Sequence, residues 1–174
     1  MSEEVIYQGK KFALVTRQEA LPDGSPHTTV MLRHPGAAVL LAFVDSEHLC
    51  MVRVKRRAVD KTLLELPAGT LDPGETPEAC ARRELQEETG YAAGRIELLR
   101  DFFPSPGILT ERMYLYIATG LTPGDQHLDD GEQLEALVVP YADALRWVLD
   151  GTIEDGKTMI GILLWESQRR EKRD

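Results

Sequence analysis

The sequence predicts one α/β (α+β) domain that begins with strands and carries its helices in the middle and at the C-terminal end. Its length of 174 residues is close to the usual size of a single domain. The first third contains short apolar runs that are separated by Pro and Gly turns, whereas later segments have the apolar spacing of helices. A content of 43% hydrophobic and 28% charged residues is typical of a globular protein.

The charge balance and the apolar runs exclude several classes of partner. The net charge of -9 argues against binding to nucleic acid or to an anionic membrane surface. The longest apolar run covers residues 37–44, which is too short to span a bilayer. Two cysteines cannot form a disulfide framework, and the first residues lack the apolar core of a signal peptide. We therefore expect a cytoplasmic protein.

The expected elements follow one another from strands to helices. Strands are predicted over residues 5–7, 11–17, 27–33, 37–44, 49–54, 96–103 and 112–118. The turn LPDGSP joins the second strand to the third, and the polar DSEH joins the fourth to the fifth, so two hairpins are expected. Apolar spacing predicts helices over 141–149 and 158–170, the last of which would bury Ile160, Leu163 and Leu164.

A further helix is predicted over residues 77–89, within GTLDPGETPEACARRELQEETGY. Thr76 is a good N-cap and Pro77 fits the first helical position. Gly90 fits the position after the helix, where the backbone turns left-handed. Both ends of this helix are therefore defined by local sequence.

Three carboxylates gather near the end of the same helix. Glu84 and Glu88 are four residues apart and share a face, and Glu87 lies on the adjoining strip. Like charges at this spacing repel one another and oppose the helix dipole, at a cost of about 0.3 to 1 kcal/mol each. Oxygen ligands without His or Cys suit a hard divalent cation, Mg²⁺ or Mn²⁺. An acidic helix face exposed to solvent is the alternative.

The wider pattern resembles the box of the Nudix hydrolases. That box has a Gly, five residues, a Glu, seven residues, Arg-Glu, a hydrophobic residue, one residue, Glu-Glu, one residue, a Gly and a hydrophobic residue. The matching positions here are Gly69, Glu75, Arg83, Glu84, Leu85, Glu87, Glu88, Gly90 and Tyr91. Tyr91 is a mild departure, because the family more often has Ile, Leu or Val there.

The resemblance implies a fold and an assembly. Family members have an αβα sandwich around a mixed β-sheet, so we expect a Nudix hydrolase domain over residues 35–174. Residues 1–34 resemble the N-terminal antiparallel β extension that pairs two subunits in one branch of the family. The resemblance therefore implies a homodimer.

The resemblance also implies a metal centre. Glu84 and Glu88 would be ligands, Glu87 would hold a metal directly or through water, and the Ala68 carbonyl would complete the site. Two or more Mg²⁺ or Mn²⁺ ions would neutralise phosphate oxygens and lower the pKa of an attacking water. Arg83, together with the glutamate at position 75, would brace the loop against the helix.

Three segments outside the helix resemble the ADP-ribose pyrophosphatase branch: RHPGAAVLLAF, LELPAGTLDPGE and SPGILTER. Pro106, sixteen residues past Gly90, matches a marker of that substrate class. The implied reaction cleaves ADP-ribose to AMP and ribose 5-phosphate. Alternatives are a pyrophosphohydrolase acting on a GDP-sugar, a dinucleotide or a flavin, and a module that senses a nucleotide without cleaving it.

The same resemblance suggests residues that contact the substrate. Arg56 matches the arginine that contacts the pyrophosphate, and Arg53 is the second candidate. Glu111 would contact the terminal ribose or water. Glu132 matches the loop glutamate that serves as general base, and Glu87 is the competing base.

One further motif points to a different chemistry. GTIEDGKT, residues 151–158, fits the P-loop pattern of ATP-binding proteins. It follows a predicted helix rather than a strand, and Glu154 and Asp155 would repel phosphates. We therefore interpret it as a loop that ends the preceding helix.

Overall fold

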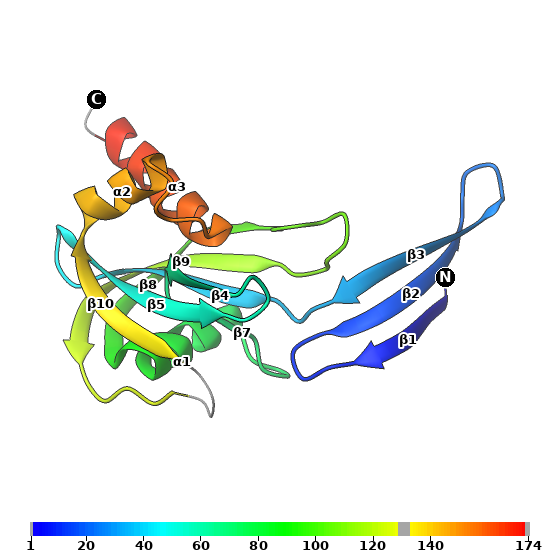
Figure 1. The fold of residues 1–174 in the computed structure, drawn as a ribbon, viewed down its shortest axis with the longest axis horizontal. Coiled ribbons are helices and arrows are strands. Elements are labelled where there is room, and N and C mark those ends of the chain that lie inside the picture. Colours follow the sequence, from blue (N-terminus) through cyan, green and yellow to red (C-terminus); the bar gives the residue numbers. More distant parts are fainter. Residues whose placement is uncertain (1, 129–132, 173–174) are drawn as a thin grey trace.

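Two β-sheets and three helices make up the computed structural model, which describes residues 2–128 and 133–172 (Figure 1). The strands are β1 (Ser2–Gln8), β2 (Ala13–Ala20), β3 (Pro26–Arg33), β4 (Ala37–Phe43), β5 (His48–Arg56), β6 (Lys61–Glu65), β7 (Ala68–Thr70), β8 (Tyr91–Phe102), β9 (Met113–Pro123) and β10 (Leu134–Pro140). The helices are α1 (Pro77–Thr89), α2 (Tyr141–Leu149) and α3 (Gly156–Glu171). Among the described residues, none of the helices combines the length and the apolar character that a membrane-spanning helix needs.

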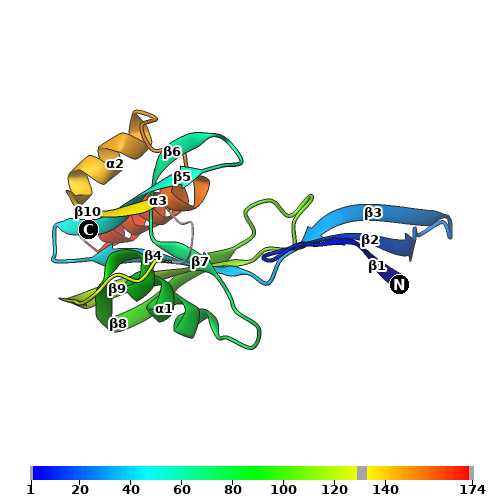
Figure 2. The ribbon, with the colours of Figure 1, turned by 60° about the horizontal axis from the view of Figure 1, so that its bottom comes forward.

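The main sheet is mixed and is covered by helices on both faces. Its described strands run in the order β10-β5-β4-β9-β8, with β6 added to β5 and β7 to β4. The β4 and β9 pair is parallel, and the other pairs are antiparallel. Every residue of β4 is buried: Leu40 packs in the cluster that includes α1, and Leu41 in the cluster with α2 and α3. This arrangement confirms the predicted sandwich around a mixed sheet (Figure 2).

Helix α1 begins and ends where the sequence predicts. The Thr76 side chain accepts a hydrogen bond from the Ala79 backbone N–H, and Pro77 occupies the first helical position. Gly90 takes a left-handed conformation at φ 75° and donates its N–H to the Gln86 carbonyl. Local capping therefore fixes the bounds of the helix that carries the carboxylates.

The N-terminal strands form a separate sheet in the order β1-β2-β3, which extends away from the main sheet (Figures 1 and 2). The predicted hairpin between β2 and β3 is present, with Ala20 opposite Pro26. This sheet is joined to the loop between β8 and β9 through Leu32. The Leu32 N–H donates to the Ile108 carbonyl, and its carbonyl accepts from the Thr110 N–H. The boundary between residues 34 and 35 stays a prediction.

The last helix differs from its prediction in start and in buried face. It begins at Gly156, two residues before the predicted position, and Asp155 is its N-cap. The prediction that Ile160 and Leu163 are buried is wrong, because both side chains are exposed, while Leu164 packs against the core as predicted. The buried positions are Thr158, Gly161 and Ile162. Gly161 lies so close to Leu66 that a Cβ atom there would come within 2.7 Å of its side chain, so this glycine selects the face that packs.

Candidate active site

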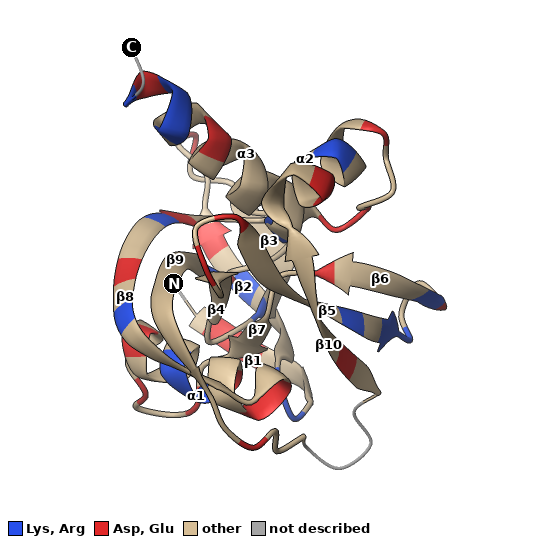
Figure 3. Cartoon of the chain, turned by 90° about the vertical axis from the view of Figure 1, so that its left-hand side faces the viewer, with Lys and Arg blue, Asp and Glu red and all other residues tan. Residues whose placement is uncertain are grey.

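A cavity of about 1220 Å³ lies between the N-terminal sheet and the main sheet. It is lined by the turn from β1 to β2, the end of β5, β7 with the loop that follows it, and one side of α1. Seven lysines and arginines and four aspartates and glutamates line it among the described residues. Figure 3 shows basic positions at the ends of β5 and β6 and acidic positions on α1. The cavity is therefore locally basic in a chain whose net charge is -9.

The acidic wall of the cavity is built by α1 and β7. Glu88 is buried, and its carboxylate accepts a hydrogen bond of 2.9 Å from the Ala68 N–H. The Glu84 carboxylate lies directly against Gly69, where a Cβ atom would come within 1.8 Å of the carboxyl carbon. Only glycine leaves room for this approach, which explains the residue type at position 69. Ala68, Glu84, Glu87 and Glu88 all line the cavity, as predicted.

Arg83 connects this wall to the loop between β7 and α1. It donates two hydrogen bonds of 2.9 Å to the Glu75 carboxylate and one of 3.2 Å to the Thr70 carbonyl. It also contacts Glu84 at 2.7 Å and Glu87 at 2.9 Å. The hydrogen bonds from Arg83 lower the pKa of Glu75 to about 2, and the same contacts raise the pKa of Arg83. These contacts are those expected of a brace between loop and helix.

The carboxylates match the chemistry of a hard divalent cation. Three of them share one wall with the backbone of Ala68 and Gly69, and the Glu84 carboxylate occupies the space where a side chain at position 69 would begin. Within residues 2–128 and 133–172, however, no three His, Cys, Asp or Glu side chains are grouped so that they could hold one ion. Arg83 bonds to Glu84 and to Glu87, so a cation would share these oxygens with the guanidinium or replace it. The residue types fit a metal, and the metal itself stays a prediction.

A thiol also packs beside this wall. Cys80 is buried, and its Sγ lies 3.5 Å from the Gly69 carbonyl as a hydrogen-bond donor. Burial raises the pKa of Cys80 to about 12, and burial raises the pKa of Cys50 to about 11. Both cysteines therefore remain protonated at neutral pH and act as packing residues.

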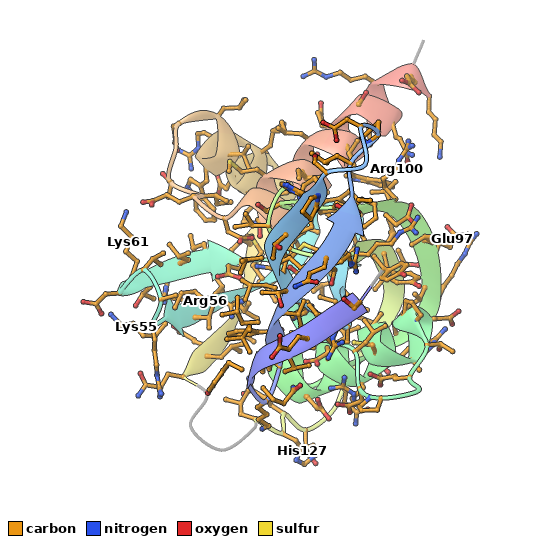
Figure 4. All side chains as sticks on the ribbon, turned by 90° about the vertical axis from the view of Figure 1, so that its right-hand side faces the viewer. Lys55, Arg56, Lys61, Glu97, Arg100 and His127 are labelled. Carbon is orange, nitrogen blue, oxygen red and sulfur yellow. The ribbon has the colours of Figure 1, made fainter. Side chains whose placement is uncertain are left out.

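The C-terminal end of α1 is held by the segment after β9. The Gly124 N–H donates to the Gly90 carbonyl at 2.6 Å, and the His127 N–H donates to the Glu87 carbonyl at 3.0 Å. The Gln126 side-chain amide donates to the Glu88 carbonyl at 2.5 Å. Figure 4 shows His127 at the edge of the molecule. These bonds satisfy carbonyls that a helix end leaves without a partner, and nothing in the sequence pattern predicts them.

The basic wall includes Arg56, which was predicted to contact the pyrophosphate. Arg56 lines the cavity and donates two hydrogen bonds, of 2.7 and 2.6 Å, to the buried Glu65 carboxylate. In Figure 4 it lies with Lys55 at the end of β5 that is near the N-terminal sheet. Arg53 instead makes an exposed ion pair of 2.5 Å with Glu135 and does not line this cavity. The structure therefore separates the two arginine candidates.

Two further predicted residues, Pro106 and Glu111, are not among the described residues that line the cavity. Pro106 is exposed in the loop between β8 and β9. Glu111 lies 3.4 Å from His34, and His34 lines the cavity whereas Glu111 does not. Glu132 lies outside the described residues, so its role as general base stays a prediction.

Sequence reasoning missed several cavity residues. Lys10, Lys11 and Phe12 line the cavity from the turn between β1 and β2. Sequence reasoning also did not single out Glu65, which accepts two hydrogen bonds from Arg56. No short motif marks Lys10, Lys11 or Phe12, because their turn meets the rest of the cavity only through packing of segments that are distant in sequence. Glu65 does not line the cavity and meets it through Arg56 on the paired strand β5.

Comparison with known proteins places these observations in a family. The NUDIX domain model matches residues 32–159, which is most of the chain. A relative named ADP-ribose pyrophosphatase from Bacillus subtilis (strain 168) is 35% identical over 93% of this chain and 89% of its own length. A relative named GDP-mannose pyrophosphatase from Klebsiella pneumoniae subsp. pneumoniae is 41% identical over 74% of this chain and 69% of its own length.

A solved structure supports the fold independently. The crystal structure of an ADP compounds hydrolase aligns with 99% of this chain and 94% of its own, with a TM-score of 0.83 and 20% sequence identity. At 20% identity the match supports the fold alone, and because it covers 99% of this chain it includes the N-terminal sheet. With the box geometry, the family match and the relatives together, the chain belongs to the Nudix hydrolase family.

Proposed function

We propose that this Nudix pyrophosphohydrolase cleaves the pyrophosphate bond of ADP-ribose with water, giving AMP and ribose 5-phosphate. The observation that carries the proposal is the cavity in which the box carboxylates face a basic wall. A diphosphate carries negative charge, so cations on one side of it and metal-binding carboxylates on the other suit its binding and hydrolysis. The relative named ADP-ribose pyrophosphatase supports this choice of substrate.

The metal requirement forms part of the proposal. Glu84, Glu87 and Glu88, with the Ala68 carbonyl, would hold Mg²⁺ or Mn²⁺. Bound ions would neutralise phosphate oxygens and make water a better nucleophile. Gly69 would support this site because its missing side chain lets the Glu84 carboxylate lie next to the backbone. Arg83 would support it by holding the loop before α1 against the helix.

Arg56 is proposed to bind the diphosphate. A guanidinium presents a planar fork of donors that suits phosphate oxygens. Within the described part of the chain, its hydrogen bonds to Glu65 use Nε and one terminal nitrogen, which leaves the other terminal nitrogen for a ligand. Glu87, which is partly exposed in the cavity, and Glu132 remain the two candidates for the general base.

Product analysis tests the proposal directly. The full-length protein is incubated with ADP-ribose and Mg²⁺ or Mn²⁺ in ¹⁸O-labelled water, and the products are identified by mass spectrometry. We expect AMP and ribose 5-phosphate in equal amounts, with one labelled oxygen in one of the two phosphates. The position of the label identifies the phosphorus that water attacks. Turnover that persists after complete metal removal would contradict the metal requirement.

A second substrate class has a specific observation in its favour. The relative named GDP-mannose pyrophosphatase shares 41% identity with this chain. A panel of ADP-ribose, a GDP-sugar, a dinucleotide and a flavin, compared by kcat/KM, separates these candidates. A GDP-sugar preference over ADP-ribose would replace the proposed substrate while keeping the reaction class. A nucleotide-sensing module without activity is disfavoured, because all box carboxylates are present.

A homodimer is proposed from the N-terminal sheet. Tyr7 is paired with Leu14, and Val30 with Thr16, two positions further along β2, so Tyr7 and Val30 lie on one face of this sheet. Their side chains are 62% and 56% exposed. Apolar side chains on one face of a projecting sheet favour burial against a second copy of the chain.

A further inference from the structure

A buried carboxylate lies behind the basic wall of the cavity. Glu65, the last residue of β6, has a side chain that is only 1% exposed. It accepts the two hydrogen bonds from Arg56 and also contacts the Lys157 ammonium group. Arg56 and Lys157 therefore share one carboxylate, although Arg56 lines the cavity and Lys157 does not.

Lys157 comes from the first turn of α3, where its side chain is 8% exposed. Its ammonium group lies 3.0 Å from the carboxylate of Asp155, the N-cap of the helix. The Thr158 hydroxyl donates to Asp155 and accepts a hydrogen bond of 2.9 Å from the Leu66 N–H. The start of α3 is thus fixed to residues 65 and 66, which lead directly into β7 and the box.

The charges of this cluster balance. Two cations, Arg56 and Lys157, face two carboxylates, Glu65 and Asp155. Burial pushes the pKa of Glu65 upward, but the hydrogen bonds from Arg56 and the charge of Lys157 hold it below its ordinary value. Removal of one cation from such a group leaves a buried charge without compensation. Glu65 therefore depends on Lys157 to remain an ordered, ionised acceptor for Arg56.

This geometry gives the GTIEDGKT segment a role that is unrelated to ATP. Lys157, the lysine of that motif, forms ion pairs with the carboxylates of Glu65 and Asp155 and does not line the cavity. We propose that Lys157 is a positioning residue, which holds Glu65 so that Arg56 is oriented to bind the diphosphate of the substrate. The inference rests on the proposed function and adds a residue that contacts neither substrate nor metal.

The test compares Lys157→Met with a matched control, Lys61→Met. Lys61 lies on β6 and makes an ion pair of 2.6 Å with Glu154, so it also links β6 to the segment before α3. This pair is exposed, at the outer edge of the hairpin formed by β5 and β6 (Figure 4). With ADP-ribose as substrate, we expect Lys157→Met to lower kcat/KM about tenfold, mainly through KM, because a displaced arginine weakens diphosphate binding. Lys61→Met is expected to stay within about twofold of the wild type.

A double variant shows whether Lys157 acts through Arg56 or through the stability of the whole protein. In the Arg56→Ala background, Lys157→Met is expected to cause no further loss of kcat/KM beyond about twofold, because both act through one group. Lys157→Arg keeps the charge and is expected to restore most of the affinity. The proposal is wrong if Lys157→Met matches the wild type, or if the two losses multiply. If Lys157→Met does not fold, Glu65→Gln tests the same link, with the same expected rise in KM.

A binding experiment tests the positioning role even if the proposed hydrolysis of ADP-ribose is wrong. If the wild type does not hydrolyse ADP-ribose, the positioning role is measured by calorimetric titration with inorganic pyrophosphate. An affinity about tenfold weaker in Lys157→Met than in the wild type and Lys61→Met would support the positioning role. Equal affinity in all three proteins would overturn it.

Discussion

Helix α1 and the N-terminal sheet both border the cavity, but they depend on different parts of the sequence. Helix α1 has its caps, its carboxylates and the arginine that braces them within residues 75–90. The N-terminal sheet contributes Lys10, Lys11 and Phe12 to the cavity and keeps Tyr7 and Val30 exposed. With β7, the acidic wall lies within residues 68–90, whereas the N-terminal sheet that also borders the cavity has an exposed apolar face. We expect substitutions in the first region to affect turnover and those in the second to affect assembly.

The largest effect is expected from the acidic wall. Glu88→Gln keeps the shape of a side chain that bonds to Ala68 but removes the charge proposed to hold a cation, so kcat/KM should fall by about a thousandfold. Steady-state hydrolysis of ADP-ribose at saturating Mg²⁺ measures the change. Glu78→Gln, on the exposed side of the same helix, is the control and should retain activity. Activity of Glu88→Gln near the wild-type level would remove this residue from the metal centre.

A larger side chain at position 69 tests whether the close contact between the Glu84 carboxylate and the Gly69 backbone is needed for activity. Gly69→Ala would place a Cβ atom on the Glu84 carboxylate, and the displaced carboxylate should lower kcat/KM by about a hundredfold. Gly156→Ala is the matched control, because a Cβ atom at that position meets nothing within 4 Å. Calorimetric titration with Mn²⁺ should show weaker binding by Gly69→Ala alone. Unaltered kinetics would mean that Glu84 can move without loss.

A substitution on the exposed face of the N-terminal sheet is expected to weaken the proposed dimer. Val30→Asp places a charge on the exposed apolar face and should weaken the proposed dimer by about fiftyfold, because a charge would be buried without a partner. Light scattering coupled to size-exclusion chromatography over a range of concentrations measures the change. Leu163→Asp, on the exposed side of α3, should leave the assembly unchanged. A monomeric wild-type protein would contradict the dimer proposal.

The smallest effect concerns the stability of the brace. The pKa of Glu75 is lowered to about 2 from 4.5 by Arg83, so ionised Glu75 stabilises the folded state above pH 4.5. Glu75→Gln should lower the free energy of unfolding by about 2 kcal/mol at pH 7. The difference from the wild type should shrink as the pH falls from 4.5 toward 2, because over this range Glu75 takes up a proton in the unfolded chain, with its ordinary pKa of 4.5, before it does so in the folded protein. Urea unfolding at several pH values measures it, and a difference that is independent of pH would contradict the ion-pair origin.

Short-range features of the fold and site were predictable from sequence. The bounds of α1 and α2 agree with the expected ranges, and the caps of α1 are the predicted residues. Glu84, Glu87 and Glu88 share one wall because a single helix carries all three, and the loop before it adds Glu75, which accepts hydrogen bonds from Arg83. In each case the determining contacts join residues that are near one another in the chain.

Features that depend on distant contacts were not predictable. The buried face of α3 is set by the approach of Gly161 to Leu66, and periodicity alone selected Ile160 and Leu163 instead. The three-residue strand β7 exists through its pairing with β4. Lys157 and Glu65 are 92 residues apart, so no local pattern joins them. Tertiary packing decides each of these cases.

The burial of both native thiols has a practical consequence for spectroscopy. Cys50 and Cys80 are protonated and shielded by the core, so maleimide reagents should leave them unmodified in the folded protein. A cysteine introduced at an exposed position of the N-terminal sheet could then carry a single fluorophore without prior removal of native cysteines. Energy transfer between such probes on two chains would then test the proposed dimer and, if it forms, follow the exchange of its subunits.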